Sequence, residues 1–190
     1  FEVGAKWRAA ALGLALDAAL FDARTDDEIG VASSSGGRTT FRNVGRTKRQ
    51  GAELDLRWRI GERWRAQMAA TYLDATYLDG LLVPAGNRIA GTQQASGYAE
   101  VAWTPVPGAE LALEGRAQSD VPVNDANSDF AEGFGLLSLR ARWQFDVGPG
   151  QIDLLGRIDN LADRRVIGSV IVNDANSRFF EPAAGRTWLI

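Results

Sequence analysis

The chain has 190 residues and a slight acidic excess, with 21 Lys and Arg against 24 Asp and Glu. It contains no cysteine and no histidine, which excludes disulfide scaffolds, thiol catalysis, Ser-His triads and the common zinc sites within this chain. Because there is no basic excess, we expect no nucleic-acid partner. The longest uncharged apolar run, residues 9–16, is too short for a spanning helix, which needs about 20 residues.

Apolar and polar residues alternate along most of the chain, which predicts extended strands with one apolar face. The clearest case is residues 136–146, where the apolar positions are Leu137, Leu139, Ala141, Trp143 and Phe145. A helix over the same residues would place Arg140 on its apolar face. In chain order, we predict nine antiparallel strands, over residues 1–8, 12–24, 39–60, 64–72, 98–104, 111–118, 136–146, 152–172 and 179–190.

The connections between these strands alternate in length. Short turns occur near residues 10, 62, 105 and 148, and the last of these has Pro149 between two glycines that suit a tight reversal. Longer polar loops occur near residues 34, 84, 125 and 174, and the loop at residues 33–37 is expected to be flexible. All the short turns must therefore lie at one end of the predicted sheet.

The tryptophans follow the same division. Five of the six are on the apolar face within about three residues of a short turn, namely Trp7, Trp58, Trp64, Trp103 and Trp143. Tyr72, Tyr77 and Tyr98 are expected towards the long loops. Indole and phenol rings concentrate where apolar surface meets lipid headgroups. This pattern predicts an all-β, antiparallel, up-and-down transmembrane barrel of the bacterial outer membrane, with the tryptophans as its interface girdle and the lipid bilayer as a partner.

Two other interpretations fit parts of the pattern. Alternation alone also suits a soluble lipocalin-like barrel that binds an apolar ligand, but that class has no reason to confine its tryptophans to one rim. A complete small outer-membrane barrel of eight strands, acting as an adhesin or passive pore, requires one predicted strand to be wrong. Nine strands is an odd number, whereas bacterial single-chain barrels have even counts, so we expect a part of a larger barrel.

Three motifs carry a family resemblance. Residues 43–53, Asn-Val-Gly-Arg-Thr-Lys-Arg-Gln-Gly-Ala-Glu, resemble the Asn-x-Gly to Gly-x-Glu segment of TonB-dependent receptors. Residues 159–165, with Ser169 following, resemble their Asn-Leu-x-Asp-(Lys/Arg) stretch, and residues 181–186 are similar to their Glu-Pro-x-x-Gly-Arg. The chain departs from the family at Val166, where Tyr is usual, and it stops before the expected terminal aromatic residue.

The resemblance implies that residues 1–190 are the C-terminal part of a 22-stranded TonB-dependent receptor barrel, with the plug domain and TonB box absent. It implies active import of a scarce nutrient, most often a ferric siderophore, across the outer membrane. TonB would act through the missing N-terminal region. The resemblance implies no enzyme activity and no cofactor.

Candidate ligand contacts are aromatic and arginine side chains near the long loops, because a ferric siderophore site needs such groups at the outer vestibule. The best placed are Tyr77, Arg88, Arg178 and Phe179. Carboxylates such as Asp153 and Asp159 lie among arginines on a sheet face, which indicates charge balance and no acid or base catalysis.

A six-residue repeat occurs in two of the long loops. Val-Asn-Asp-Ala-Asn-Ser stands at residues 123–128 and again at 172–177. Asp125, Asn127 and Asp129 have the alternate spacing of calcium ligands, but the Gly and distant Glu of an EF-hand loop are missing. Turns in which Asn and Asp side chains cap the local backbone explain both copies, so we expect a structural role and no metal.

Overall fold

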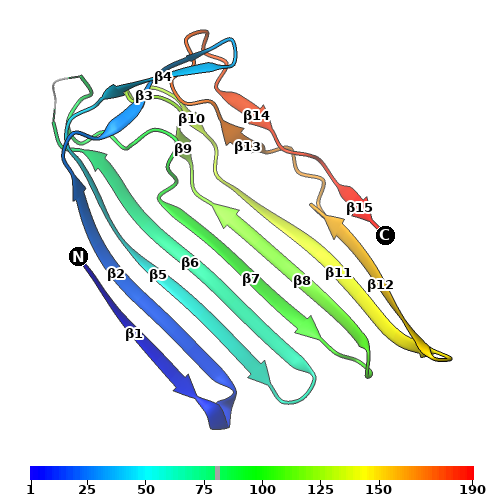
Figure 1. Cartoon of the computed structure of the whole chain (residues 1–190). Helices are drawn as coiled ribbons and strands as arrows, with labels where there is room; N and C mark the ends of the chain where they lie inside the picture. The colour runs from blue at the N-terminus through cyan, green and yellow to red at the C-terminus, as the bar shows by residue number, and fades with distance from the viewer. Residues whose placement is uncertain (80–81) are drawn as a thin grey trace.

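The protein is described by a computed structural model that covers residues 1–79 and 82–190. Within these residues, nine strands form one antiparallel sheet in which every strand pairs with its neighbours in chain order (Figure 1). This confirms the predicted all-β, up-and-down architecture. The strands of this sheet are β1 (Glu2–Ala9), β2 (Leu14–Thr25), β5 (Thr47–Ile60), β6 (Trp64–Tyr77), β7 (Ala95–Trp103), β8 (Ala109–Gln118), β11 (Phe134–Val147), β12 (Gly150–Asp159) and β15 (Thr187–Leu189).

The short and long connections lie at opposite ends of the sheet, as predicted (Figure 1). The short ones include η1 (Ala10–Leu12) and the Gly148-Pro149 turn. Three of the long ones fold into small two-stranded sheets among the described residues, pairing β3 (Ile29–Ser35) with β4 (Arg38–Asn43), β9 (Val121–Pro122) with β10 (Phe130–Ala131), and β13 (Ile167–Val170) with β14 (Phe180–Pro182).

The pairing register aligns the apolar side chains of neighbouring strands. Met68 on β6, for example, lies opposite Leu56 on β5 and Ala99 on β7. Many large apolar side chains of this face are exposed, which is the reverse of a soluble sheet. They include Val3, Leu20, Met68, Tyr72, Val101, Leu111, Leu113, Leu137, Leu139, Ile152 and Leu154.

The sheet has two free edges, β1 and β15, so the barrel is not closed within the part of the chain that the structure describes. The helical segment found among the described residues is neither long nor apolar enough to cross a membrane.

Two features differ from the predicted strands and loops. β12 ends at Asp159, not at residue 172, because Asn160 and Asp163 adopt positive φ angles of 53° and 51° and form a turn. The side-chain oxygen of Asn160 accepts a hydrogen bond of 2.9 Å from the Arg164 N–H, which holds that turn. The expected flexible loop at residues 33–37 is the tip of the β3–β4 hairpin.

The tyrosines are also distributed differently. Tyr72 is exposed on the apolar face, but Tyr77 and Tyr98 have the opposite strand parity and lie on the charged face. Tyr98 donates a hydrogen bond of 3.3 Å to Glu100 on the same strand. Tyr77 and Tyr98 thus lie towards the long loops, as expected, but on the charged face and not on the apolar one.

Buried apolar residues are concentrated at the long-connection end. One cluster contains Val44, Tyr77 and Val83, with Ile89 packed against it. A second contains Val121, Val123, Ala131 and Phe179, with Ile167 and Val170 packed against it. The long connections thus have a core of their own, whereas most of the nine-stranded sheet has none beneath it.

Candidate functional site

The four long connections form one packed unit, which we call the loop cluster and define as residues 26–46, 82–94, 119–133 and 160–186. The two apolar clusters lie within it and at the adjoining end of β6. Figure 1 shows the β3–β4 hairpin beside the segment that joins β13 to β14, although these come from widely separated parts of the chain.

The carboxylate of Asp125 is the centre of the polar contacts in the loop cluster. Its Oδ1 accepts a hydrogen bond of 2.8 Å from the Tyr77 hydroxyl, and its Oδ2 accepts one of 3.0 Å from the Asn173 side-chain amide. The Arg42 guanidinium lies 3.5 Å from Oδ2. The Asn87 amide donates to the Asp125 carbonyl over 2.8 Å. Since Asp125 is only 8% exposed, these partners replace the water that it would otherwise bind.

The two copies of the repeat contact each other directly. The Asp125 N–H donates to the Asn173 side-chain oxygen over 3.0 Å, and the Asn173 N–H donates to the Val123 carbonyl over the same distance. Within the second copy, Asp174 Oδ1 accepts hydrogen bonds from the Asn176 and Arg178 N–H groups at 2.9 and 3.0 Å.

In the first copy, the Asn124 side-chain oxygen accepts a hydrogen bond from the Ser128 N–H over 3.1 Å. The prediction of side-chain-capped turns is therefore confirmed for both copies. The Asn127 side chain donates to the Arg88 carbonyl and accepts from the Arg88 N–H, so its groups are engaged with protein. No group of three acidic side chains that could hold a metal occurs in the described ranges.

Arg88, Arg178 and Phe179 lie in the loop cluster, and Tyr77 lies at the adjoining end of β6. Tyr77 and Phe179 are buried in the two apolar clusters. The Arg88 guanidinium bonds to the Asp120 carboxylate at 2.7 Å and lies 5.8 Å from the centre of the Phe130 ring. Arg178, in contrast, is exposed. Tyr77, Arg88 and Phe179 are thus engaged with other protein groups, whereas Arg178 is exposed, and ligand contact by any of the four stays a prediction.

Sequence reasoning did not single out Asn87 and Arg42, and it assigned Asp125 only to a turn. A signal for Asp125 and Asn173 was present in the repeated six-residue segment. Asn87 and Arg42 belong to no motif, so their contacts with Asp125 had no sequence signal.

Hydrogen bonds and neighbouring cations lower the pKa values of three carboxyl groups in the loops. The Arg178 and Asn176 N–H groups lower the pKa of Asp174 below its ordinary value. The Arg46 guanidinium and N–H do the same for the pKa of Asp79. For Glu28, the Arg49 guanidinium is the main cause of the lowered pKa, and the Thr47 hydroxyl adds to it. These carboxylates are therefore charged at neutral pH.

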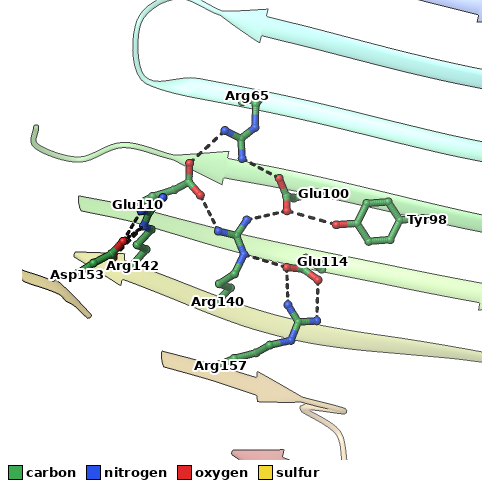
Figure 2. Close-up of polar contacts among 9 residues, drawn as sticks. All are labelled: Arg65, Tyr98, Glu100, Glu110, Glu114, Arg140, Arg142, Asp153 and Arg157. Atoms are coloured by element: carbon green, nitrogen blue, oxygen red, sulfur yellow. Dashed lines mark hydrogen bonds and ion pairs between the residues drawn. The ribbon is translucent and has the colours of Figure 1, made fainter. Parts of the chain in front are cut away.

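The charged face of the sheet carries a second polar network (Figure 2). Arg140 on β11 bonds to three glutamates, Glu100, Glu110 and Glu114, over 2.9, 2.8 and 3.2 Å. Arg65 contacts Glu100 and Glu110 at 3.1 and 3.2 Å. Strands β6, β7, β8 and β11 are thereby linked by side chains as well as by their backbone hydrogen bonds.

The carboxylates that were predicted to balance arginines do so. Asp153 pairs with Arg142 on the neighbouring strand, and Asp159 lies 2.9 Å from Arg157. Each of these acids has a fixed cationic partner, so the arrangement supplies charge compensation.

The five girdle tryptophans are exposed on the apolar face near the short turns, with 36% to 55% of their surface accessible. Trp64 and Trp103 stack with ring centres 5.7 Å apart. The Trp58 indole N–H donates to the Leu12 carbonyl over 3.1 Å, so its polar end has a partner at the turn while its ring faces outward. Contact of these rings with lipid is a prediction.

Comparison with known proteins identifies a matching family and similar solved structures. A family model described as "TonB dependent receptor-like, beta-barrel" matches residues 1–161. The siderophore receptor PiuA from Acinetobacter baumannii is 24% identical, with a TM-score of 0.75, and the ferric yersiniabactin uptake receptor FyuA from Yersinia pestis is 19% identical, with a TM-score of 0.77. The copper transporter OprC is 17% identical, with a TM-score of 0.72.

Each of these matches covers 98% of this chain but only 27%, 28% and 29% of the respective structures. The chain therefore spans less than a third of the length of the barrel proteins that it resembles. At these identities the three structures establish the shared fold, and each cargo in their names belongs to that protein.

Proposed function

The chain belongs to the TonB-dependent receptor-like β-barrel family, whose members are outer-membrane proteins, and we propose that it is the C-terminal part of a 22-stranded receptor that imports a scarce nutrient. The observation that carries the proposal is the nine-stranded sheet with an exposed apolar face and all its long connections at one end. A wall of this kind separates lipid from a charged interior.

Within that proposal, the cargo is a ferric siderophore and the energy comes from TonB. The family is one of transport receptors, and several of its structural relatives are named for siderophores or ferric complexes. In this proposal the TonB box belongs to an N-terminal region outside residues 1–190. Family membership favours this function over the soluble lipocalin-like barrel and over the small adhesin or passive pore.

The chain's contribution is barrel wall and part of the outer mouth. The charged face lines the interior, where Arg140 and Arg157 compensate the glutamates, and the loop cluster stands at the outer end of the wall. Arg178 is the predicted ligand contact that is exposed at this end, and its guanidinium suits an anionic ferric chelate.

Uptake by cells that carry the intact receptor tests the proposal. We would delete the gene, restore it on a plasmid, and measure accumulation of radioactive iron supplied with a panel of catecholate, hydroxamate and carboxylate siderophores. We expect uptake of at least one ferric complex to require the gene and to stop in a strain without TonB.

Because one similar structure is named as a copper transporter, copper uptake is measured alongside iron uptake. Gene-dependent uptake of copper with no effect on any ferric complex would overturn the ferric cargo while leaving the transporter intact. Iron uptake that continues without TonB would overturn the energised mechanism. An antibody to this chain should detect a band several-fold heavier than 20.5 kDa in the outer-membrane fraction, whereas a band near that mass would contradict the larger barrel.

A further inference from the structure

The loop cluster contains a contact that none of the transport arguments uses. Asp125 and Asn173 exchange two hydrogen bonds of 3.0 Å, one through the Asp125 N–H and one through its carboxylate. The two residues are 48 positions apart, and they belong to the connections that follow β8 and β12.

This pair also contacts the other two long connections. The Asn173 amide donates to the Val31 carbonyl on β3 over 2.7 Å, and the Asn173 carbonyl accepts from the Ser34 N–H over 3.1 Å. On the other side, the Asn87 amide donates to the Asp125 carbonyl over 2.8 Å. One polar pair thus reaches residues from every long connection.

Burial makes these contacts costly to break. Asp125 is 8% exposed and Val123 next to it is fully buried, so water has little access to the hydrogen bonds if one partner is lost. A buried donor or acceptor left without a partner costs more than the net value of the bond itself. The pair also joins connections that start from distant strands of the sheet, β2 and β12 (Figure 1).

We infer that the Asp125–Asn173 pair fastens the four long connections of this chain into a single rigid unit, which moves as one body or not at all. Its loops are then not independent lids, and any opening of this side of the barrel mouth shifts all four together. The inference concerns the loop cluster itself and does not depend on which cargo is carried.

Hydrogen exchange followed by mass spectrometry on the intact receptor in lipid nanodiscs, with no ligand added, tests this. Asp125→Asn keeps the shape but places an N–H₂ donor or a weaker acceptor against the Asn173 amide. We expect amide exchange to accelerate about tenfold or more in residues 29–43, 82–94, 120–132 and 167–182 together. Acceleration confined to residues 120–132 would overturn the inference.

Asp129→Asn is the matched control, because Asp129 is exposed and, among the described residues, its side chain bonds to the adjacent Phe130 N–H alone. It should leave the other three connections unchanged. Asn173→Ala removes the other partner of the pair. If Asp125→Asn does not fold, hydrogen exchange of the four connections in Asn173→Ala tests the inference in the same way. The two substitutions share the bond between the Asn173 amide and the Asp125 carboxylate, so the double variant should accelerate exchange less than the sum of the two single effects, and fully additive effects would contradict a shared fastening.

Discussion

The guanidinium of Arg157 on β12 reaches past β11 and donates two hydrogen bonds of 2.8 Å to the two carboxylate oxygens of Glu114 on β8. Paired guanidinium and carboxylate groups of this geometry are among the stronger polar contacts in proteins. Because backbone pairing joins only adjacent strands, this contact ties together two strands that are not backbone-paired with each other. Arg140 makes the equivalent link from β11 to Glu100 on β7.

Arg157→Ala should therefore destabilise the barrel wall. Glu114 is largely buried and would keep Arg140 as its cationic partner after Arg157 is removed. We therefore expect the free energy of unfolding to fall by about 1–3 kcal/mol. The measurement is urea-induced unfolding of the intact receptor in lipid, followed by tryptophan fluorescence. Arg142→Ala is the control, because its pair with Asp153 is exposed and should contribute about 0–1 kcal/mol. Equal effects of the two substitutions would show that the cross-strand contact adds nothing.

A charged side chain introduced on the apolar face should destabilise the barrel by an amount that depends on its depth in the membrane. Met68 is midway along the exposed face of β6, so Met68→Arg should cost about 2–4 kcal/mol if that face contacts lipid hydrocarbon. The adjacent Gln67 points to the charged side opposite Glu100, and Gln67→Arg should be tolerated. Yield of heat-modifiable folded barrel in outer-membrane extracts distinguishes the two. A well-tolerated Met68→Arg would argue against a membrane-facing surface.

The loop cluster should become less stable in acid, whereas pH changes near neutrality should leave its stability unchanged. The folded pKa values of Asp174, Asp79 and Glu28 are lowered, so their stabilisation is complete above their ordinary pKa of about 4 and is lost as the pH falls through the folded values. The chain has no histidine to titrate between pH 5 and 8.

Hydrogen exchange, corrected for the intrinsic effect of pH, should thus be constant in the loops from pH 8 to 5 and rise below about pH 4. Asp174→Asn should remove part of that rise in residues 172–178. A loop opening centred near pH 6 would be incompatible with these three carboxylates as its cause.

Arg178 and Arg88 should respond differently to substitution by alanine. Arg178 is exposed, so Arg178→Ala should weaken binding of an anionic ferric chelate about tenfold with no change in loop exchange. Arg88→Ala also removes contacts with Asp120 and Phe130, so it should weaken binding and accelerate exchange in residues 119–133. Isothermal titration with the ferric siderophore identified by uptake provides the affinities. Unchanged affinity in Arg178→Ala would remove Arg178 from the site.

The strand faces, the short turns and the tryptophan rim follow from the amino-acid sequence alone. These features depend on a period of two residues and on local turn chemistry, as at residues 136–146 and at Gly148-Pro149. The same parity rule also assigns Tyr98 to the face of Glu100, so its place on the charged side was available from the sequence. The family motifs additionally predicted that these strands belong to a receptor barrel.

How the long connections meet is seen only in the folded protein. Asn173 contacts Val31, which is 142 positions away, and Asp125 meets Tyr77 across 48 positions. No periodicity or spacing encodes such pairs, because they depend on how loops from separate strand pairs pack over the end of the sheet. The repeated Val-Asn-Asp-Ala-Asn-Ser segment indicated two similar turns, and it was burial and reciprocal hydrogen bonding that joined them into one unit.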